Sequence, residues 1–206
     1  MARVTRAQFD TLPTLDQYGA ESELEPGDVM IHNDSKQWNA YKESGPLASF
    51  HVSMMVDKAN RIHALPTAGV QKSVVRNMGD MAIVFRLVPG LLNPFAGQAA
   101  QYAEKMDGIA YSKGRALAMP FASKSFDAAA RKRLTKYATA AYDYRPKHVV
   151  CSELIILAYQ FAFGEQHASF INLDAKHATP GDLESCFLKN PNSWQLVGRV
   201  KGVNVH

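Results

Sequence analysis

Cys151 is the residue whose type and position most clearly suggest chemistry. It begins a segment, 151–163, that is apolar on nearly every side and is followed by Gly164, so we expect a buried helix with Cys151 in its first turn. Backbone N–H groups at a helix N-terminus lack partners and carry partial positive charge. Such a site can lower the pKa of a cysteine and can stabilise an oxyanion during acyl transfer. A small buried hydrophobe is the commoner role of a lone cysteine, and for this position we give the two interpretations about equal weight.

Two histidines could supply the base that such a nucleophile needs. His51 lies within a predicted strand, 50–56, and His63 within the predicted return strand, 61–65. If the turn at 57–60 closes a hairpin, the two imidazoles come to neighbouring strands and share a face. One imidazole would then orient the other toward a thiol, which is the nucleophile, base and orienter arrangement of a catalytic triad. A lone histidine on an apolar strand is more often a core residue than a catalytic one. The presence of His63 on the neighbouring strand favours the catalytic interpretation of His51.

A metal site is the alternative use of a cysteine and two histidines. No further ligand stands at a recognisable spacing and the chain has no H-E-x-x-H motif, so we expect neither a metal nor a cofactor. His32 and His148 are further candidates by residue type, and both are expected to lie in loops. Cys186 is expected to be a structural residue.

The elements that must position these residues form an α+β pattern. Short strands with turns between them are expected at 29–31, 50–56, 61–65, 70–75, 81–87 and 193–197. Helices are expected at 96–106, 126–141 and 151–163, with a further one starting at Thr179-Pro180. The sum predicts a small antiparallel sheet packed against helices.

The length of 206 residues suits a single domain spanning 1–206, in which residues 1–22 form a polar lead-in segment. Hydrophobic residues make up 47% of the chain and charged residues 20%, which is typical of a globular protein and argues against extensive disorder.

The net charge of +4 is mild, and its densest cluster is Arg131, Lys132, Arg133 and Lys136. Such a cluster either attracts an anionic surface or forms the solvated face of a helix, and we favour the second interpretation. No nucleic-acid-binding motif is present, so no nucleic-acid partner is expected.

The first residues have no apolar core or cleavage pattern, so we expect a protein made in the cytoplasm without a signal peptide. Export would then need a secretion machinery that does not read one. No window approaches the run of about 18 apolar residues that a membrane-spanning helix requires, so we expect no transmembrane segment.

Five short motifs occur in an order that points to a known family. They are Pro26-Gly27-Asp28, Phe50-His51-Val52-Ser53-Met54-Met55-Val56, His63-Ala64, Tyr142-Asp143-Tyr144 and Val150-Cys151-Ser152-Glu153-Leu154. Together they resemble the circularly permuted papain-like hydrolases, the YiiX/YaeF-type branch of the NlpC superfamily, which is related to the lecithin:retinol acyltransferase group. In unpermuted relatives the cysteine helix precedes the histidine strand, whereas here the histidine comes first. The resemblance spans roughly residues 22–200 and includes the segment 179–183.

The resemblance implies a role for each matched residue. Cys151 would be the nucleophile, with its own N–H donating to the oxyanion, His51 the base and His63 the third polar residue. It implies weaker oxyanion or substrate-binding roles for Ser152, Tyr144 and Asp28. One departure is Ser53, where relatives often have glycine two residues after the histidine.

The activity that the resemblance implies is a cysteine peptidase or amidase that works through an acyl-enzyme. The first expectation is hydrolysis of a peptidoglycan stem peptide, either in recycling or as a secreted antibacterial effector with an immunity protein or secretion-machinery partner. The alternative is a lipid or fatty-acyl hydrolase or acyltransferase, for which the apolar stretch 88–95 would line an acyl channel. A non-catalytic binding module of the same fold is the third hypothesis, against which the intact Cys, His and His set argues. Loops 32–49 and 88–125 would shape the pocket.

Overall fold

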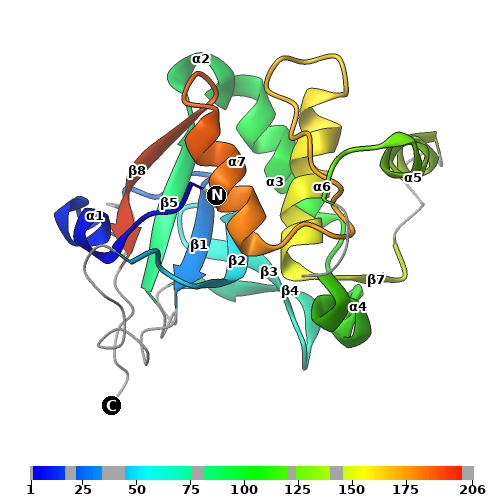
Figure 1. Ribbon diagram of the computed structural model, residues 1–206, viewed down its shortest axis with the longest axis horizontal. Helices are drawn as coiled ribbons and strands as arrows, with labels where there is room; N and C mark the ends of the chain where they lie inside the picture. Colours follow the sequence, from blue (N-terminus) through cyan, green and yellow to red (C-terminus); the bar gives the residue numbers. More distant parts are fainter. Residues whose placement is uncertain are drawn as a thin grey trace.

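The computed structural model describes residues 2–16, 22–33, 45–75, 81–119, 124–139 and 146–200. Within these ranges a sheet carries a layer of helices on one face, and α3, α6 and α7 lie together against it (Figure 1). The predicted α+β class with an antiparallel sheet is therefore confirmed.

The main sheet has six strands in the order β4-β3-β2-β1-β5-β8, and every neighbouring pair is antiparallel. Their bounds are β1 Val29–Asn33, β2 Ser49–Met55, β3 Asn60–Leu65, β4 Gly69–Val74, β5 Met81–Leu87 and β8 Trp194–Val200. The predicted hairpin between β2 and β3 is present, and the Asp57 carboxylate accepts hydrogen bonds from the N–H groups of Ala59 and Asn60, both at 2.8 Å. A separate two-stranded parallel pair consists of β6 Ala110–Tyr111 and β7 His148–Val149.

The helices include the three that were expected in the second half of the chain and the one starting at Pro180. Their bounds are α1 Arg6–Thr11, α2 Pro89–Leu91, the π-helical turn η4 Leu92–Ala96, α3 Gly97–Glu104, α4 Lys113–Ala118, α5 Ala128–Thr139, α6 Cys151–Phe163 and α7 Pro180–Lys189. Helix α6 has the predicted bounds, whereas α1 and α4 were not expected. In the part of the chain that the structure describes, no helix has both the length and the apolar character needed to cross a membrane.

The two faces of the sheet bury separate apolar clusters, a division that matters for the site. Ile31 and Val52 belong to the larger cluster, which also contains the inward side of α6, including Leu154. Met30 and Met55, which alternate with them along the strands, belong to the smaller cluster on the opposite face. Residues of β1 and β2 therefore point either toward the α6 layer or away from it.

The turn before β1 explains the motif Pro26-Gly27-Asp28. Gly27 has a φ of +88°, and a Cβ there would lie 2.7 Å from the Cβ of Ala96, so only glycine fits. The hydroxyl of Tyr159 on α6 donates a hydrogen bond to the carbonyl oxygen of Gly27. The motif thus connects the start of β1 to α6.

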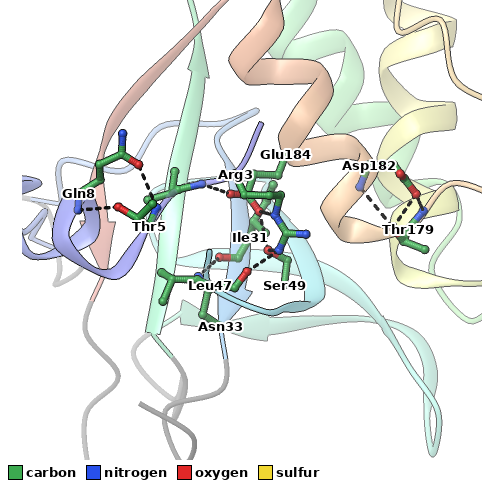
Figure 2. A network of polar contacts seen from close by, with 11 residues as sticks. Arg3, Thr5, Gln8, Ile31, Asn33, Leu47, Ser49, Thr179, Asp182 and Glu184 are labelled. Atoms are coloured by element: carbon green, nitrogen blue, oxygen red, sulfur yellow. Dashed lines mark hydrogen bonds and ion pairs between the residues drawn. The ribbon is translucent and has the colours of Figure 1, made fainter. Parts of the chain in front are cut away.

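The N-terminal segment is part of the packed fold rather than a lead-in, which corrects that expectation. Figure 2 shows Arg3 between Glu184 of α7 and the segment that enters β2. Nε of Arg3 donates to Oε2 of Glu184 at 2.6 Å, and Nη2 donates to the carbonyl oxygen of Leu47 at 2.6 Å and to Oγ of Ser49 at 2.7 Å. The N–H of Val4 donates to Oε1 of the same carboxylate at 2.7 Å. These four hydrogen bonds hold the segment to α7 and to the chain that enters β2.

Candidate active site

Cys151 is the first residue of α6, as the sequence predicts. The preceding residue, Val150, is extended, with φ −109° and ψ 168°, and its N–H donates to Oε2 of Glu153 at 3.2 Å. Nη1 of Arg115, on α4, donates to Oε1 of the same carboxylate at 2.8 Å. Glu153 of the Cys-Ser-Glu-Leu motif therefore caps the helix and ties α4 to the turn that carries the thiol.

The surroundings of the thiol change one expectation. Cys151 is buried, with 5% of its surface exposed. Burial raises the pKa of the Cys151 thiol to about 11, although the backbone N–H groups of Val52, Ser152 and Cys151 itself favour the thiolate. The expected lowering of the pKa by the helix N-terminus is therefore wrong, because desolvation outweighs these N–H groups. At neutral pH the group is a thiol.

The raised pKa of the Cys151 thiol predicts how its reaction with iodoacetamide depends on pH. Because only the thiolate reacts, the alkylation rate is expected to rise about tenfold per pH unit from neutral pH to about pH 9.5 without a plateau. Mass spectrometry of the Cys151 peptide after timed quenching measures this rate. Cys186 provides an internal reference, because burial also raises the pKa of its thiol to about 11. A plateau for Cys151 at or below pH 8 would contradict the prediction.

His51 and His63 come together as predicted. Nε2 of His51 lies 3.1 Å from Nδ1 of His63, and Nε2 of His63 lies 3.2 Å from Oγ of Ser73 on β4. The register pairs His63 with Ser53, so His51 is its diagonal neighbour on the same face. Among the described residues no hydrogen bond occupies Nδ1 of His51. That nitrogen is therefore available to exchange a proton with another group.

His32 lies on β1 and not in a loop, because the strand continues to Asn33; the expectation of a loop is wrong. It is fully buried and pairs directly with His51, with ring centroids 5.1 Å apart. Its Nε2 lies 2.8 Å from Oγ of Ser53. This contact gives the side chain of Ser53 a partner that a glycine at this position would lack.

A positive charge lies beside these histidines. Nη1 of Arg61 is 3.4 Å from Nε2 of His32, and Nε of Arg61 donates to Oγ of Ser73 at 3.3 Å. Burial, with the charges of His63 and Arg61, lowers the pKa of His51 to about 3. Burial and the charge of Arg61 lower the pKa of His63 to about 4. Burial also lowers the pKa of His32 well below its ordinary value. All three imidazoles are therefore neutral at pH 7, and burial disfavours their protonation.

The thiol and the His51 imidazole approach the same point of β2 from different sides. The thiol lies against the N–H of Val52, which is bonded to the carbonyl carbon of His51. Val52 points toward the α6 layer, whereas His51 shares the opposite face with His32. Within the described ranges no hydrogen bond joins Sγ of Cys151 to an imidazole. The structure thus places the thiol beside the backbone of His51 without joining the two side chains.

The other predicted site residues have different surroundings. Ser152 is fully buried and its hydroxyl donates to the carbonyl oxygen of Ala178 at 2.6 Å, so its backbone N–H is the group that remains near the thiol. The buried carboxylate of Asp28 accepts hydrogen bonds from Nε and Nη2 of Arg86 at 2.8 and 2.7 Å, at the end of the β1–β2 pair opposite to His51. Tyr144 lies outside the described residues.

The remaining candidates from the sequence can also be located. His148 lies on β7 and is exposed, and its carbonyl oxygen accepts a hydrogen bond from Nη2 of Arg115. Cys186 lies on α7 as a half-buried free thiol. Neither makes a contact with the histidine pair among the contacts of the described residues.

A second imidazole, that of His177, lies beside α6 and is not among the site residues expected from the sequence. Nδ1 of His177 lies 2.7 Å from Oδ2 of Asp174, and Nη2 of Arg133 donates to the same oxygen at 2.7 Å. The next residue, Ala178, accepts the hydrogen bond from Ser152, which places this pair close to the first turn of α6. The spacing Asp-x-x-His in the sequence was the available signal. His177 is therefore a competing candidate for the base.

Tyr111 of β6 is a further residue not expected at the site: burial, together with the charge of the Cys151 thiolate, raises the pKa of its phenol to about 12. Nothing in its sequence surroundings indicates this proximity, because the two residues are far apart along the chain. In the ranges covered by the structure, no three His, Cys, Asp or Glu side chains are arranged to hold a metal ion.

Comparison with known proteins adds no assignment: no family model, curated protein or solved structure matches this chain significantly.

Proposed function

We propose that the protein is a cysteine-nucleophile amide hydrolase with a permuted papain-like fold, in which Cys151 attacks and His51 acts as base. The observation that supports this most is the position of the thiol. It begins a buried helix, is surrounded by three backbone N–H groups, and lies against the strand that carries the His51–His63 pair. This set combines a nucleophile, oxyanion donors and an oriented imidazole.

The reaction would begin from a neutral thiol and a neutral imidazole. As Sγ of Cys151 bonds to the substrate carbonyl carbon, the thiol proton passes to Nδ1 of His51, and the carbonyl oxygen gains the negative charge. His51 would then donate Nε2–H to Nδ1 of His63, which stabilises the imidazolium. Collapse of the intermediate breaks the C–N bond, and the leaving amine takes the proton from His51. Water, deprotonated by the same imidazole, then hydrolyses the thioester and restores the thiol.

This route requires the His51 side chain to turn toward the thiol when substrate binds. Catalytic hydrogen bonds in unliganded enzymes are often long and tighten only in the substrate complex, so the present separation is compatible with the route. Because His51 shares with His32 the face of β2 opposite to the α6 layer, its side chain must cross to the side of the Val52 amide, against which the thiol lies.

The substrate proposed first is a peptide bond of the peptidoglycan stem, which follows from the resemblance to the NlpC superfamily. The net charge of +4 suits an anionic polymer. If the protein acts as a secreted antibacterial effector, an immunity protein or a secretion-machinery component would be the matching partner.

Digestion of purified peptidoglycan tests this substrate. The wild type is expected to release new muropeptides, resolved by mass spectrometry, and Cys151→Ala is expected to release none. Cys186→Ala is the matched control and should retain the activity, because Cys186 lies on α7 away from the proposed chemistry. An intact wall after treatment with wild-type protein would contradict the peptidoglycan assignment, and equal digestion by Cys151→Ala would contradict the nucleophile.

One observation favours a fatty-acyl substrate as the second candidate. Phe50, directly before His51, has 49% of its surface exposed, and Leu117 on α4 has 80% exposed. These are the large exposed apolar side chains of the described residues, and both belong to elements next to the proposed active site. Incubation with phospholipid vesicles, followed by mass spectrometry of extracted lipids, tests this candidate with the same two variants.

A further inference from the structure

The pairing of β6 with β7 brings Tyr111 to the segment that leads into α6. The register places Tyr111 opposite Val149, and the N–H of Ser112 donates to the carbonyl oxygen of Val149 at 2.9 Å. Paired residues of neighbouring strands share a face of the sheet, so the side chains of Tyr111 and Val149 point the same way.

The side chain of Cys151 points to the same side of the chain as that of Val149. Val150 is extended, and residues two apart in an extended chain point to the same side, so Cys151 lies on the side of Val149. Tyr111 also packs against the large apolar cluster that contains Cys151. The phenol ring and the thiol therefore lie on the same side of the segment that leads into α6.

Electrostatics agree with this geometry. Burial, together with the negative charge of the Cys151 thiolate, raises the pKa of Tyr111 to about 12. The phenol is therefore protonated at any physiological pH and can donate a hydrogen bond. Among the described residues its hydroxyl has no hydrogen-bond partner, and the side chain is half-buried.

We propose that Tyr111 is a catalytic residue whose phenolic O–H donates a hydrogen bond to the oxyanion formed when Cys151 attacks a carbonyl group. This inference rests on the proposed function and adds a side-chain donor to the backbone N–H groups around the thiol. Tyr111 keeps its proton throughout: it shortens its hydrogen bond to the carbonyl oxygen as the C–S bond forms and lengthens it when the C–N or C–O bond of the leaving group breaks. A donor fixed in a water-poor site stabilises the developing charge more than water would.

The test compares two reactions of the same thiol. Acylation by p-nitrophenyl acetate forms an oxyanion, whereas alkylation by iodoacetamide does not. Tyr111→Phe is expected to lower the acylation rate about 100-fold, the typical cost of removing one oxyanion donor, and to leave the alkylation rate within about twofold of the wild type. Tyr102→Phe, which removes a hydroxyl from a ring packed on Phe161 of α6, is the matched control and should change neither rate.

Each outcome has one meaning. An acylation rate of Tyr111→Phe within about twofold of the wild type would overturn the inference. An equal fall in acylation and alkylation would also overturn it, because Tyr111 would then act on the thiol and not on the oxyanion. If wild type and Cys151→Ala acylate at the same rate, the proposed function itself fails, a result recognisable before any tyrosine variant is measured.

Discussion

His51→Asn is expected to lower the acylation rate of Cys151 by p-nitrophenyl acetate about 1,000-fold at neutral pH, within the range usual for loss of a general base. The thiol has a pKa of about 11, so it cannot attack efficiently unless a neighbouring group takes its proton. Asparagine keeps the size and polarity of the side chain but cannot accept that proton. The release of p-nitrophenol, followed spectroscopically under single-turnover conditions, measures the rate.

Two further histidine variants make this result specific. His167→Asn is the matched control, because His167 lies beyond the far end of α6, stacked on Phe163, and its loss should leave acylation unchanged. His177→Asn tests the competing imidazole beside Asp174. A large loss in His177→Asn with full activity in His51→Asn would assign the base to His177 and contradict the proposed role of His51.

The largest expected effect on stability comes from Arg3→Ala. The side chain of Glu184 is fully buried, and Arg3 is its charged partner at 2.6 Å. Without Arg3 the Glu184 carboxylate keeps hydrogen bonds from the N–H of Val4 and Oγ of Ser49 but loses its charged partner. Loss of one member of a buried ion pair typically costs about 3–5 kcal/mol. The free energy of unfolding, measured by urea titration and fluorescence, is expected to fall by that amount, with loss of the N-terminal contacts around Val4.

The matched control for this prediction is Arg131→Ala. Arg131 also pairs with a glutamate, Glu165, but 57% of its side chain is exposed, so its loss should change the free energy of unfolding by less than about 1 kcal/mol. Replacing both Arg3 and Glu184 with apolar residues of similar size should recover much of the lost stability, because no unpaired charge would remain. If Arg3→Ala unfolds like the wild type, the N-terminal segment does not support the fold.

The main strands and α6 could be predicted because local patterns agree with the tertiary structure. Strand-forming residues and the turn residues between them predicted the hairpin that holds His51 and His63. The Asp57 carboxylate stabilises the turn by accepting a backbone hydrogen bond, as aspartate commonly does in turns. Helix α6 could be recognised because it is apolar on all sides and ends at Gly164, which has a φ of +70°. These signals come from neighbouring residues and need no knowledge of the rest of the chain.

The features that escaped prediction depend on contacts between distant residues. The two-residue strands β6 and β7 are too short to leave a pattern, yet their pairing places Tyr111 opposite Val149, two residues before Cys151. The N-terminal segment looks polar, and its place in the fold depends on Glu184, far along the chain. The pKa of Cys151 was misjudged for a similar reason, because the helix N-terminus is a local property whereas burial results from the whole fold.

Trapping of an acyl-enzyme tests the central claim, that Cys151 is a nucleophile activated by His51, most directly. Wild type, Cys151→Ala and His51→Asn would each be mixed with p-nitrophenyl acetate, quenched in acid at short times, and analysed by intact-mass and peptide mass spectrometry. We expect one acetyl group on the Cys151 peptide of the wild type, none in Cys151→Ala, and only slow acetylation in His51→Asn. Acetylation of the wild type at other residues alone, or equal acetylation of Cys151 with and without His51, would contradict it.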